Sequence, residues 1–241
     1  MTPRVVWILL ALLTAAPTWA QTVEPEFRVV TTSFPPFSVE VDGRVRGVAA
    51  DLVQAVLDDL GVRTPIEVFP WARAYETARR GPQVLIFQIA RTAERETQFK
   101  WVGEVASYDV HLYRRADRTE IAPAGLADAA RWKIGGLLRD VKTTHLQEQG
   151  VAVTTYSDEA NGLAMLLGGR IDLMPSDRQA MLQRLKLAGL PPDRVVPVLR
   201  LDAISGPLYM AFSPDTPDAL VQRVRASLDR VRAGHKDGGR S

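Results

Sequence analysis

Two arginines follow an apolar stretch of the chain. Residues 84–90 read VLIFQIA, Arg91 ends this stretch, and Arg95 lies four positions further on. A guanidinium is planar, stays protonated and donates two parallel hydrogen bonds to a carboxylate. Two fixed positive charges at the end of an apolar strand therefore favour a binding place for a small anion. The same residues also fit a surface arginine that pairs with Glu94 or Glu96.

An acidic residue occupies a comparable place later in the chain. Asp177 closes the segment 169–177, GRIDLMPSD, in which a predicted strand at 171–175 gives way to a helix. A carboxylate at this position caps the helix by accepting its free backbone N–H groups. One oxygen can cap while the other faces a bound ammonium, so the sequence leaves both roles open.

Strand-forming runs alternate with helical patterns from residue 27 onward, which predicts βαβ units and a mostly parallel sheet. The pattern runs to about residue 108 and then restarts, which indicates two lobes, and a last strand and helix form a third piece. The predicted strands lie at 27–32, 38–41, 44–47, 66–69, 84–89, 105–114, 133–136, 152–156, 171–175 and 208–212, and the predicted helices at 51–60, 71–80, 140–149, 160–167, 179–187 and 220–232.

The composition excludes several classes of protein. The 241 residues are 46% hydrophobic and 24% charged, which is typical of a soluble globular chain with one large or two smaller domains. A net charge of +2 without a long Lys/Arg block gives no reason to expect nucleic acid as a partner. Since the chain has no cysteine, it has no disulfide, no thiolate metal site and no lipid-attachment cysteine.

Residues 1–20 have the pattern of a secretory signal peptide. Arg4 precedes the apolar run 5–13, and small residues precede a cleavage site before Gln21. The run is too short for a membrane anchor, which needs roughly 20 apolar residues. We therefore expect a mature protein that is free in the periplasm and not lipid-anchored, with a flexible polar tail at 233–241.

Several linked motifs resemble the bacterial extracellular solute-binding proteins of the polar amino acid transport type. The resemblance implies a periplasmic-binding-protein-like α/β fold of type II, in which two lobes joined by two crossing strands close on a ligand. It implies lobe 1 at 22–108 plus 206–232 and lobe 2 at 109–205. The motifs that carry it are FRVVTTSFPPFSVEVDGRVRGVAADLVQAVLDDLG at 27–61, ARTAERETQFKWVG at 90–103, GRIDLMPSD at 169–177 and LYMAFSPDTPDALVQRVRASLDRVRAG at 208–234.

The resemblance also implies roles for individual residues. The arginine of the family's Thr-x-x-Arg step pairs with the ligand's carboxylate, and Arg95 matches it. Asp177 matches the acid that binds the ligand's ammonium, and Phe34 and Trp71 match aromatic lining positions, although core packing is the usual role of a lone aromatic. The expected ligand-binding set is Phe34, Trp71, Arg73, Gln88, Thr92, Arg95, Asp140 and Asp177.

One segment departs from the family pattern. Relatives usually have Gly followed by Ser or Thr where a helix N-terminus attracts the ligand's carboxylate, whereas residues 138–144 read LRDVKTT. Asp140 could cap this helix and occupy the place that an anion would take. The ligand's acidic group is then held mainly by Arg95, or the ligand is not an ordinary α-amino acid.

The resemblance implies capture of a small polar solute, an amino acid or related carboxylate, for delivery to an inner-membrane ABC permease. We expect a monomer without cofactor, metal or enzymatic activity, because nucleophile, phosphate-loop and zinc motifs are missing and His111, His145 and His235 are far apart. Two alternatives stay open: a periplasmic, dehydratase-like enzyme acting on a small carboxylate, and a ligand-sensing receptor subunit.

Overall fold

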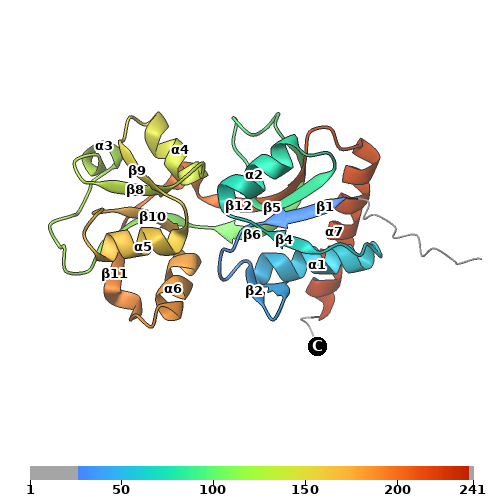
Figure 1. Cartoon of the computed structure of the whole chain (residues 1–241), viewed down its shortest axis with the longest axis horizontal. Coiled ribbons are helices and arrows are strands. Elements are labelled where there is room, and N and C mark those ends of the chain that lie inside the picture. The colour runs from blue at the N-terminus through green and yellow to red at the C-terminus, as the bar shows by residue number, and fades with distance from the viewer. Residues whose placement is uncertain (1–26, 239–241) are drawn as a thin grey trace, which may run out of the picture.

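The computed structural model describes residues 27–238, with side chains to residue 234, and shows an α/β fold of two groups of elements (Figure 1). The predicted signal peptide at 1–20, the first residues of predicted lobe 1 and the last three of the predicted tail lie outside this range. Over residues 27–238, each helix is too short or too polar to span a bilayer.

A five-stranded mixed sheet organises the first lobe, in the order β4-β1-β5-β12-β6. The first three of these strands are parallel, and β12 is antiparallel to both of its neighbours. A separate hairpin turns at Asp42 and Gly43, whose positive φ angles of 50° and 72° suit a tight turn. The strands of this lobe are β1 (Arg28–Thr31), β2 (Val39–Val41), β3 (Arg44–Arg46), β4 (Ile66–Val68), β5 (Val84–Ala90), β6 (Lys100–Tyr108) and β12 (Gly206–Phe212).

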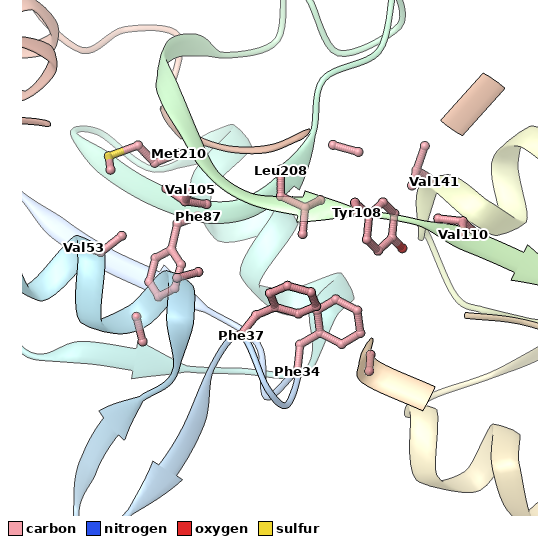
Figure 2. Close-up of a cluster of buried hydrophobic side chains, with 14 of the residues drawn as sticks. Phe34, Phe37, Val53, Phe87, Val105, Tyr108, Val110, Val141, Leu208 and Met210 are labelled. Atoms are coloured by element: carbon pink, nitrogen blue, oxygen red, sulfur yellow. The ribbon is translucent and has the colours of Figure 1, made fainter. Parts of the chain in front are cut away.

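Helices cover both faces of this sheet because its strands are apolar on both sides. On one face, α1 (Val48–Asp59) and α7 (Asp218–Gly238) pack together over Phe87. Figure 2 shows Val53 of α1 beside Phe87 and Met210. On the other face, α2 (Trp71–Arg80) covers Ile86 and its neighbours. The sheet is thus a rigid support for the side chains at its edge.

The second lobe contains a smaller antiparallel sheet, β10-β7-β11, and the parallel pair β8-β9. Its helices lie around these strands (Figure 1). The elements are β7 (Val110–Arg115), α3 (Leu126–Ala129), β8 (Ile134–Leu137), α4 (Val141–Glu148), β9 (Val153–Tyr156), α5 (Glu159–Leu167), β10 (Met174–Asp177), α6 (Arg178–Leu187), η1 (Pro192–Arg194), β11 (Val195–Arg200) and η2 (Asp202–Ile204).

The chain passes between the two groups of elements twice. On the first passage Asp109 separates β6 from β7, and on the second the residues after Leu201 lead into β12. Hydrogen bonds join the two passages, from the N–H of Val110 to Ser205 Oγ at 3.0 Å and from the N–H of Leu201 to the Val110 carbonyl at 2.8 Å. The predicted lobe boundaries state which residues move together as a unit. They stay predictions, because a single structure does not report motion.

Several sequence predictions differ from the structure. The sheets are not mostly parallel, since β7, β10, β11 and β12 pair antiparallel with their neighbours, and the strand predicted at 171–175 lies at Met174–Asp177. The predicted strand 105–114 is two strands, because the chain enters a second sheet after Asp109. The strand β11 was not predicted. Residues 233–238, at the start of the predicted flexible tail, belong to α7, which continues to Gly238; the flexibility of this segment stays a prediction.

Candidate functional site

A cavity of about 390 Å³ lies between the two lobes. Its lining comes from both sides, which gives it two distinct walls. The first-lobe wall includes Phe34, Trp71, Gln88, Arg95 and Tyr108, and the second-lobe wall includes Asp140, Lys142, Asp158 and Glu159. Of the predicted ligand-binding set, Phe34, Trp71, Gln88, Arg95 and Asp140 therefore meet at one cavity.

Arg95 is a buried cation on the first-lobe wall. Its side chain belongs to a residue only 4% exposed, and one guanidinium nitrogen, Nη1, donates to the Ala90 carbonyl at 3.3 Å. The guanidinium carbon lies 5.7 Å from the Trp71 ring centroid and 5.0 Å from that of Tyr75. Within residues 27–238 no carboxylate forms an ion pair with Arg95. Most of its donors are therefore available to an anion in the cavity.

Thr92 holds the turn from which Arg95 projects. Both its carbonyl and its Oγ1 accept from the N–H of Arg95, at 3.0 and 3.3 Å. Thr92 is not among the residues that line the cavity. In this structure it acts on the position of Arg95, and its predicted contact with a ligand stays a prediction.

Gln88 occupies a β-bulge in β5. Met210 pairs with Phe87 and Tyr209 pairs with Ile89, so Gln88 is the extra residue on its strand, and its φ is 67°. Bulges redirect side chains, and positive φ in a non-glycine residue is strained. Gln88 is 5% exposed, lines the cavity, and has no hydrogen-bond partner for either amide atom within the described part of the chain.

Aromatic rings surround the space between the polar groups. Figure 2 shows Phe34 against Phe37 and, beside them, Tyr108 projecting from the end of β6; the centroid distances are 5.1 Å for Phe34 to Phe37 and 6.2 Å for Phe34 to Tyr108. Trp71 begins α2 and donates from Nε1 to the Arg139 carbonyl at 2.9 Å. This bond joins the two walls, so Trp71 both lines the cavity and holds its sides together.

Lys142 is the central cation of the second-lobe wall. Its side chain is 1% exposed, and Nζ lies 2.9 Å from Tyr108 Oη, 2.9 Å from Asp140 Oδ1 and 3.2 Å from Glu159 Oε1. Burial alone lowers the pKa of Lys142, but the negative charges of Asp140 and Glu159 and the neighbouring tyrosines outweigh it, so the pKa is raised well above its ordinary value. The ammonium is therefore charged and already paired.

The acids of this wall are likewise engaged with the protein. Asp140 caps α4, accepting from the N–H of Lys142 at 2.8 Å, as the sequence predicted for the atypical segment 138–144. Glu159 lies within ion-pair distance of Lys142 and, at 3.5 Å, of Arg184, although neither contact has hydrogen-bond geometry. The wall therefore carries two carboxylates, Asp140 and Glu159, with a cation beside each of them. It also carries a third, the exposed Asp158, which caps α5 and has no ion pair within the described residues.

Asp177 is buried at the junction of the lobes and does not line the cavity. Oδ1 accepts from the N–H of Ala180 at 2.9 Å and caps α6, while Oδ2 accepts from the N–H of Asp109 at 2.8 Å. Burial raises the pKa of Asp177, and the backbone donors partly offset this. Both oxygens already accept hydrogen bonds, and its contact with a ligand's ammonium stays a prediction.

Arg73 and Arg91 lie apart from the cavity lining. The exposed Arg73 stacks at 4.2 Å from the centroid of the Phe69 ring. Arg91 donates from Nε to Glu96 at 2.8 Å, the surface pairing considered as an alternative for the arginines. Only one of the two arginines at the end of β5 faces the cavity.

Sequence reasoning did not identify Lys142, Tyr108 and Glu159 as cavity residues. The available signal was a lysine two positions after an Asp N-cap, at the carboxyl end of a strand, where ligands collect in α/β folds. The lining combines charged side chains with aromatic and aliphatic ones, which suits a small ligand with both charged and apolar parts. Among residues 27–238, no group of three His, Asp or Glu residues is placed to hold a metal ion.

The family model of the bacterial extracellular solute-binding proteins, family 3, matches residues 28–236. The chain is 21% identical over 208 residues to the probable amino-acid-binding protein YxeM of Bacillus subtilis (strain 168), covering 84% of this chain and 76% of that protein.

Two solved structures have similar folds. An ancestral arginine-binding protein bound to arginine matches with a TM-score of 0.74 and 22% identity, over 88% of this chain and 93% of that one. A histidine kinase sensor domain similar to periplasmic binding proteins matches with a TM-score of 0.77 and 18% identity, over 88% and 92%. At these identities the likeness shows a two-lobed periplasmic-binding-protein fold.

Proposed function

Since this chain belongs to the bacterial extracellular solute-binding proteins, family 3, we propose that it captures a small polar solute, an amino acid or a related carboxylate, between its lobes. The observation that carries the proposal is Arg95, a buried guanidinium that lines a cavity of about 390 Å³ and has no ion pair within the described residues. The name of the Bacillus subtilis relative supports a ligand of the amino acid type.

The polar and aromatic residues of the cavity have complementary roles in this proposal. Arg95 binds the ligand's carboxylate through charge-assisted hydrogen bonds, and Thr92 holds Arg95 in place. Phe34 and Trp71 pack against the apolar body of the ligand. Gln88 contributes a donor and an acceptor that the protein leaves unpartnered.

Closure of the lobes is the proposed mechanism of capture, with 22–108 plus 206–232 moving against 109–205. A ligand that touches both walls stabilises the closed form by its difference in affinity for the two forms. The hydrogen bond from Trp71 to the Arg139 carbonyl and the ion pair between Glu76 and Arg139 cross between the lobes and support this form.

The family and the signal-like residues 1–20 support a periplasmic location. There the closed, monomeric protein would deliver its solute to an inner-membrane ABC permease. The polar groups of the cavity are charged groups, the Gln88 amide and hydroxyls, and among the described residues no histidine or cysteine lines it. We therefore propose binding without catalysis, in preference to a dehydratase-like enzyme or a receptor subunit.

Calorimetric titration of the purified mature chain with amino acids and small organic acids tests this proposal. We expect stoichiometric binding that raises the melting temperature, with the ligand recovered chemically unchanged. Arg95→Ala should weaken binding by about 2–5 kcal/mol, at least about thirtyfold, because a buried charge loses its partner.

Arg91→Ala is the matched control, since Arg91 pairs with Glu96 outside the cavity lining. It should leave the affinity unchanged. Undiminished affinity in a folded Arg95→Ala variant would show that Arg95 is not part of the binding site. Steady product formation would favour the dehydratase-like enzyme over the proposed binding function.

A further inference from the structure

The charges of the two cavity walls are balanced differently. On the second-lobe wall, Asp140 and Glu159 lie within 2.9 and 3.2 Å of the Lys142 ammonium, and Glu159 also lies 3.5 Å from Arg184. On the first-lobe wall, Arg95 has no ion pair within residues 27–238. The cavity therefore offers an unpaired positive charge and two buried carboxylates that already have cations beside them. The third lining carboxylate, Asp158, is exposed and accepts from the N–H of Asn161 as the cap of α5.

The ammonium of Lys142 is enclosed by protein oxygens and donates a hydrogen bond to one of them, Tyr108 Oη. It carries three N–H donors, and three oxygen atoms, from Tyr108, Asp140 and Glu159, lie within 3.2 Å of Nζ. The rings of Phe34 and Tyr108 also lie 5.8 and 5.6 Å from Nζ. An internal cation thus occupies the aromatic and acidic surroundings that would otherwise suit the ammonium of a bound ligand.

We propose that Lys142 takes the place of a ligand ammonium, so that the cavity selects small carboxylic acids without an α-amino group. This inference rests on the proposed function, because it assumes that a solute carboxylate binds Arg95. The favoured ligands are 2-oxo, 2-hydroxy or unsubstituted acids with an apolar or aromatic body.

The cost of desolvation decides against an amino acid. An ammonium that enters the cavity loses its hydration and needs a carboxylate in return, but Asp140 and Glu159 already have cationic neighbours. Asp158 is exposed to solvent and caps α5, so its charge is screened and gives a weaker return. It would also meet the like charges of Lys142 and Arg95. Rejection by repulsion and by missing partners is a general means of specificity.

The Gln88 amide suits a ligand that has a neutral oxygen, a ketone or a hydroxyl, where an amino acid has its ammonium. Its amide is buried, lines the cavity and lacks partners for both the donor and the acceptor among the described residues. The amide N–H group can donate to a ketone, and the amide can donate to or accept from a hydroxyl. The bulge at Gln88 therefore places a neutral hydrogen-bonding group, and not a second acid, on the wall that holds Arg95.

Matched pairs of ligands test this inference on the full mature chain. The probes are phenylpyruvate, 3-phenyllactate and L-phenylalanine, then 4-methyl-2-oxopentanoate and L-leucine, and finally L-arginine, each titrated by calorimetry. We expect the oxo or hydroxy acid to bind at least about tenfold more tightly than its amino acid, the size of a charged hydrogen bond. Equal or tighter binding of the amino acids would overturn the inference and leave the proposed function intact.

The variant Lys142→Met separates the lysine from the rest of the cavity. It releases Asp140 and Glu159, so the preference should move by about tenfold or more toward the amino acid of each pair. Lys186→Met, at an exposed position on α6, is the control and should keep the wild-type ratio.

Where Lys142→Met does not fold, the double variant with Glu159→Gln removes one of the released charges and is titrated in its place. A folded variant with the wild-type ratio would overturn the role of Lys142. No binding of any acid or amino acid to the wild-type chain would instead end the proposed function together with this inference.

Discussion

The two walls of the cavity differ in whether their charged groups have ion-pair partners within the protein. On the first-lobe wall, Arg95 and Gln88 are buried with donors and acceptors that the protein does not use. On the second-lobe wall, the two carboxylates of Asp140 and Glu159 are balanced by the two cations Lys142 and Arg184. The first-lobe wall thus leaves its charge without an ion-pair partner, whereas the buried charges of the second-lobe wall have such partners, although the Glu159 oxygens accept no hydrogen bond within the described residues.

This difference separates binding from stability. A buried polar group without a partner costs about 1–3 kcal/mol, so the first-lobe wall is destabilised until a ligand supplies the missing bonds. The ion pairs of the second-lobe wall gain their partners on folding. Substitutions on the first wall should mainly change affinity, and substitutions on the second should mainly change the free energy of unfolding.

The largest effect on stability is expected at Asp140. Asp140→Ala removes a helix cap and a carboxylate 2.9 Å from the buried Lys142 ammonium. Breaking a buried ion pair from one side typically costs about 3–5 kcal/mol, so the free energy of unfolding should fall by about 3 kcal/mol or more. Urea denaturation of the two proteins measures the change.

Asp158→Ala is the matched control for this substitution. Asp158 is an exposed N-cap of α5 that accepts from the N–H of Asn161 at 2.8 Å, so its loss should cost only about 1 kcal/mol. Similar losses in both variants would mean that the lysine pairing contributes little, and the contrast between the walls would lose its energetic basis.

A smaller effect of the opposite kind is expected at Gln88. Gln88→Gly removes a side chain whose φ of 67° is strained, so the free energy of unfolding should stay the same or rise by up to about 1 kcal/mol. The affinity for the best ligand should fall about fivefold, since about 1 kcal/mol of hydrogen bonding is lost. Denaturation and calorimetry on the same samples measure both quantities.

Gln83→Gly serves as the control because Gln83 also has a positive φ, 49°, but does not line the cavity. It should change stability in the same direction and leave the affinity alone. A Gln88→Gly variant with full affinity would show that the unpartnered amide is not part of the binding wall.

The smallest effect concerns Glu76, which pairs across the lobes with Arg139. A hydrogen bond from Arg79 lowers the pKa of Glu76, with further contributions from the charges of Arg79, Arg80 and Arg139. Because this pKa is depressed, the stabilisation is complete above the ordinary value of 4.5 and is lost as the pH falls through the lowered one. Only the Arg139 contribution depends on closure.

The affinity of the wild-type chain should therefore fall more than that of Glu76→Gln when the pH is lowered from about 6 to about 4. The difference should not exceed about 1 kcal/mol, since the pair is partly exposed. Calorimetry measures the affinity of both proteins at the two pH values. Because the ligand's own protonation affects both proteins equally, it drops out of the difference between them. Identical pH profiles would exclude the ion pair from lobe closure.

Local patterns predicted most of the fold because most elements are defined locally. Apolar periodicity and terminating glycines predicted the longer helices of both lobes and the strands β1, β4 and β5, but not the short helix α3. The edge strand β11 was missed because Pro197 interrupts its pattern and its pairing with β7 is a tertiary feature. The local sequence likewise does not show that the strand ends at Asp109, because the chain there leaves one sheet and enters another.

Cavity residues that lie within a short sequence motif could be predicted. Those whose role depends on residues far away in the sequence were missed. Arg95 could be recognised from its own segment. Lys142 could not, because its partner Tyr108 lies 34 positions away and only the fold brings them together. Likewise, the bulge at Gln88 depends on how β5 pairs with β12, and no pattern within residues 84–90 reveals it.

The hydrogen bond between Asp109 and Asp177 depends differently on the amino acid at each of the two positions. The donor from the crossing chain is the main-chain N–H of residue 109, which every amino acid except proline supplies. The acceptor needs two side-chain oxygens, one for this N–H and one for the cap of α6. A substitution at position 109 other than proline therefore keeps this link and loses the pairing of Asp109 with Arg200, whereas a substitution of Asp177 removes the link and the cap of α6 together.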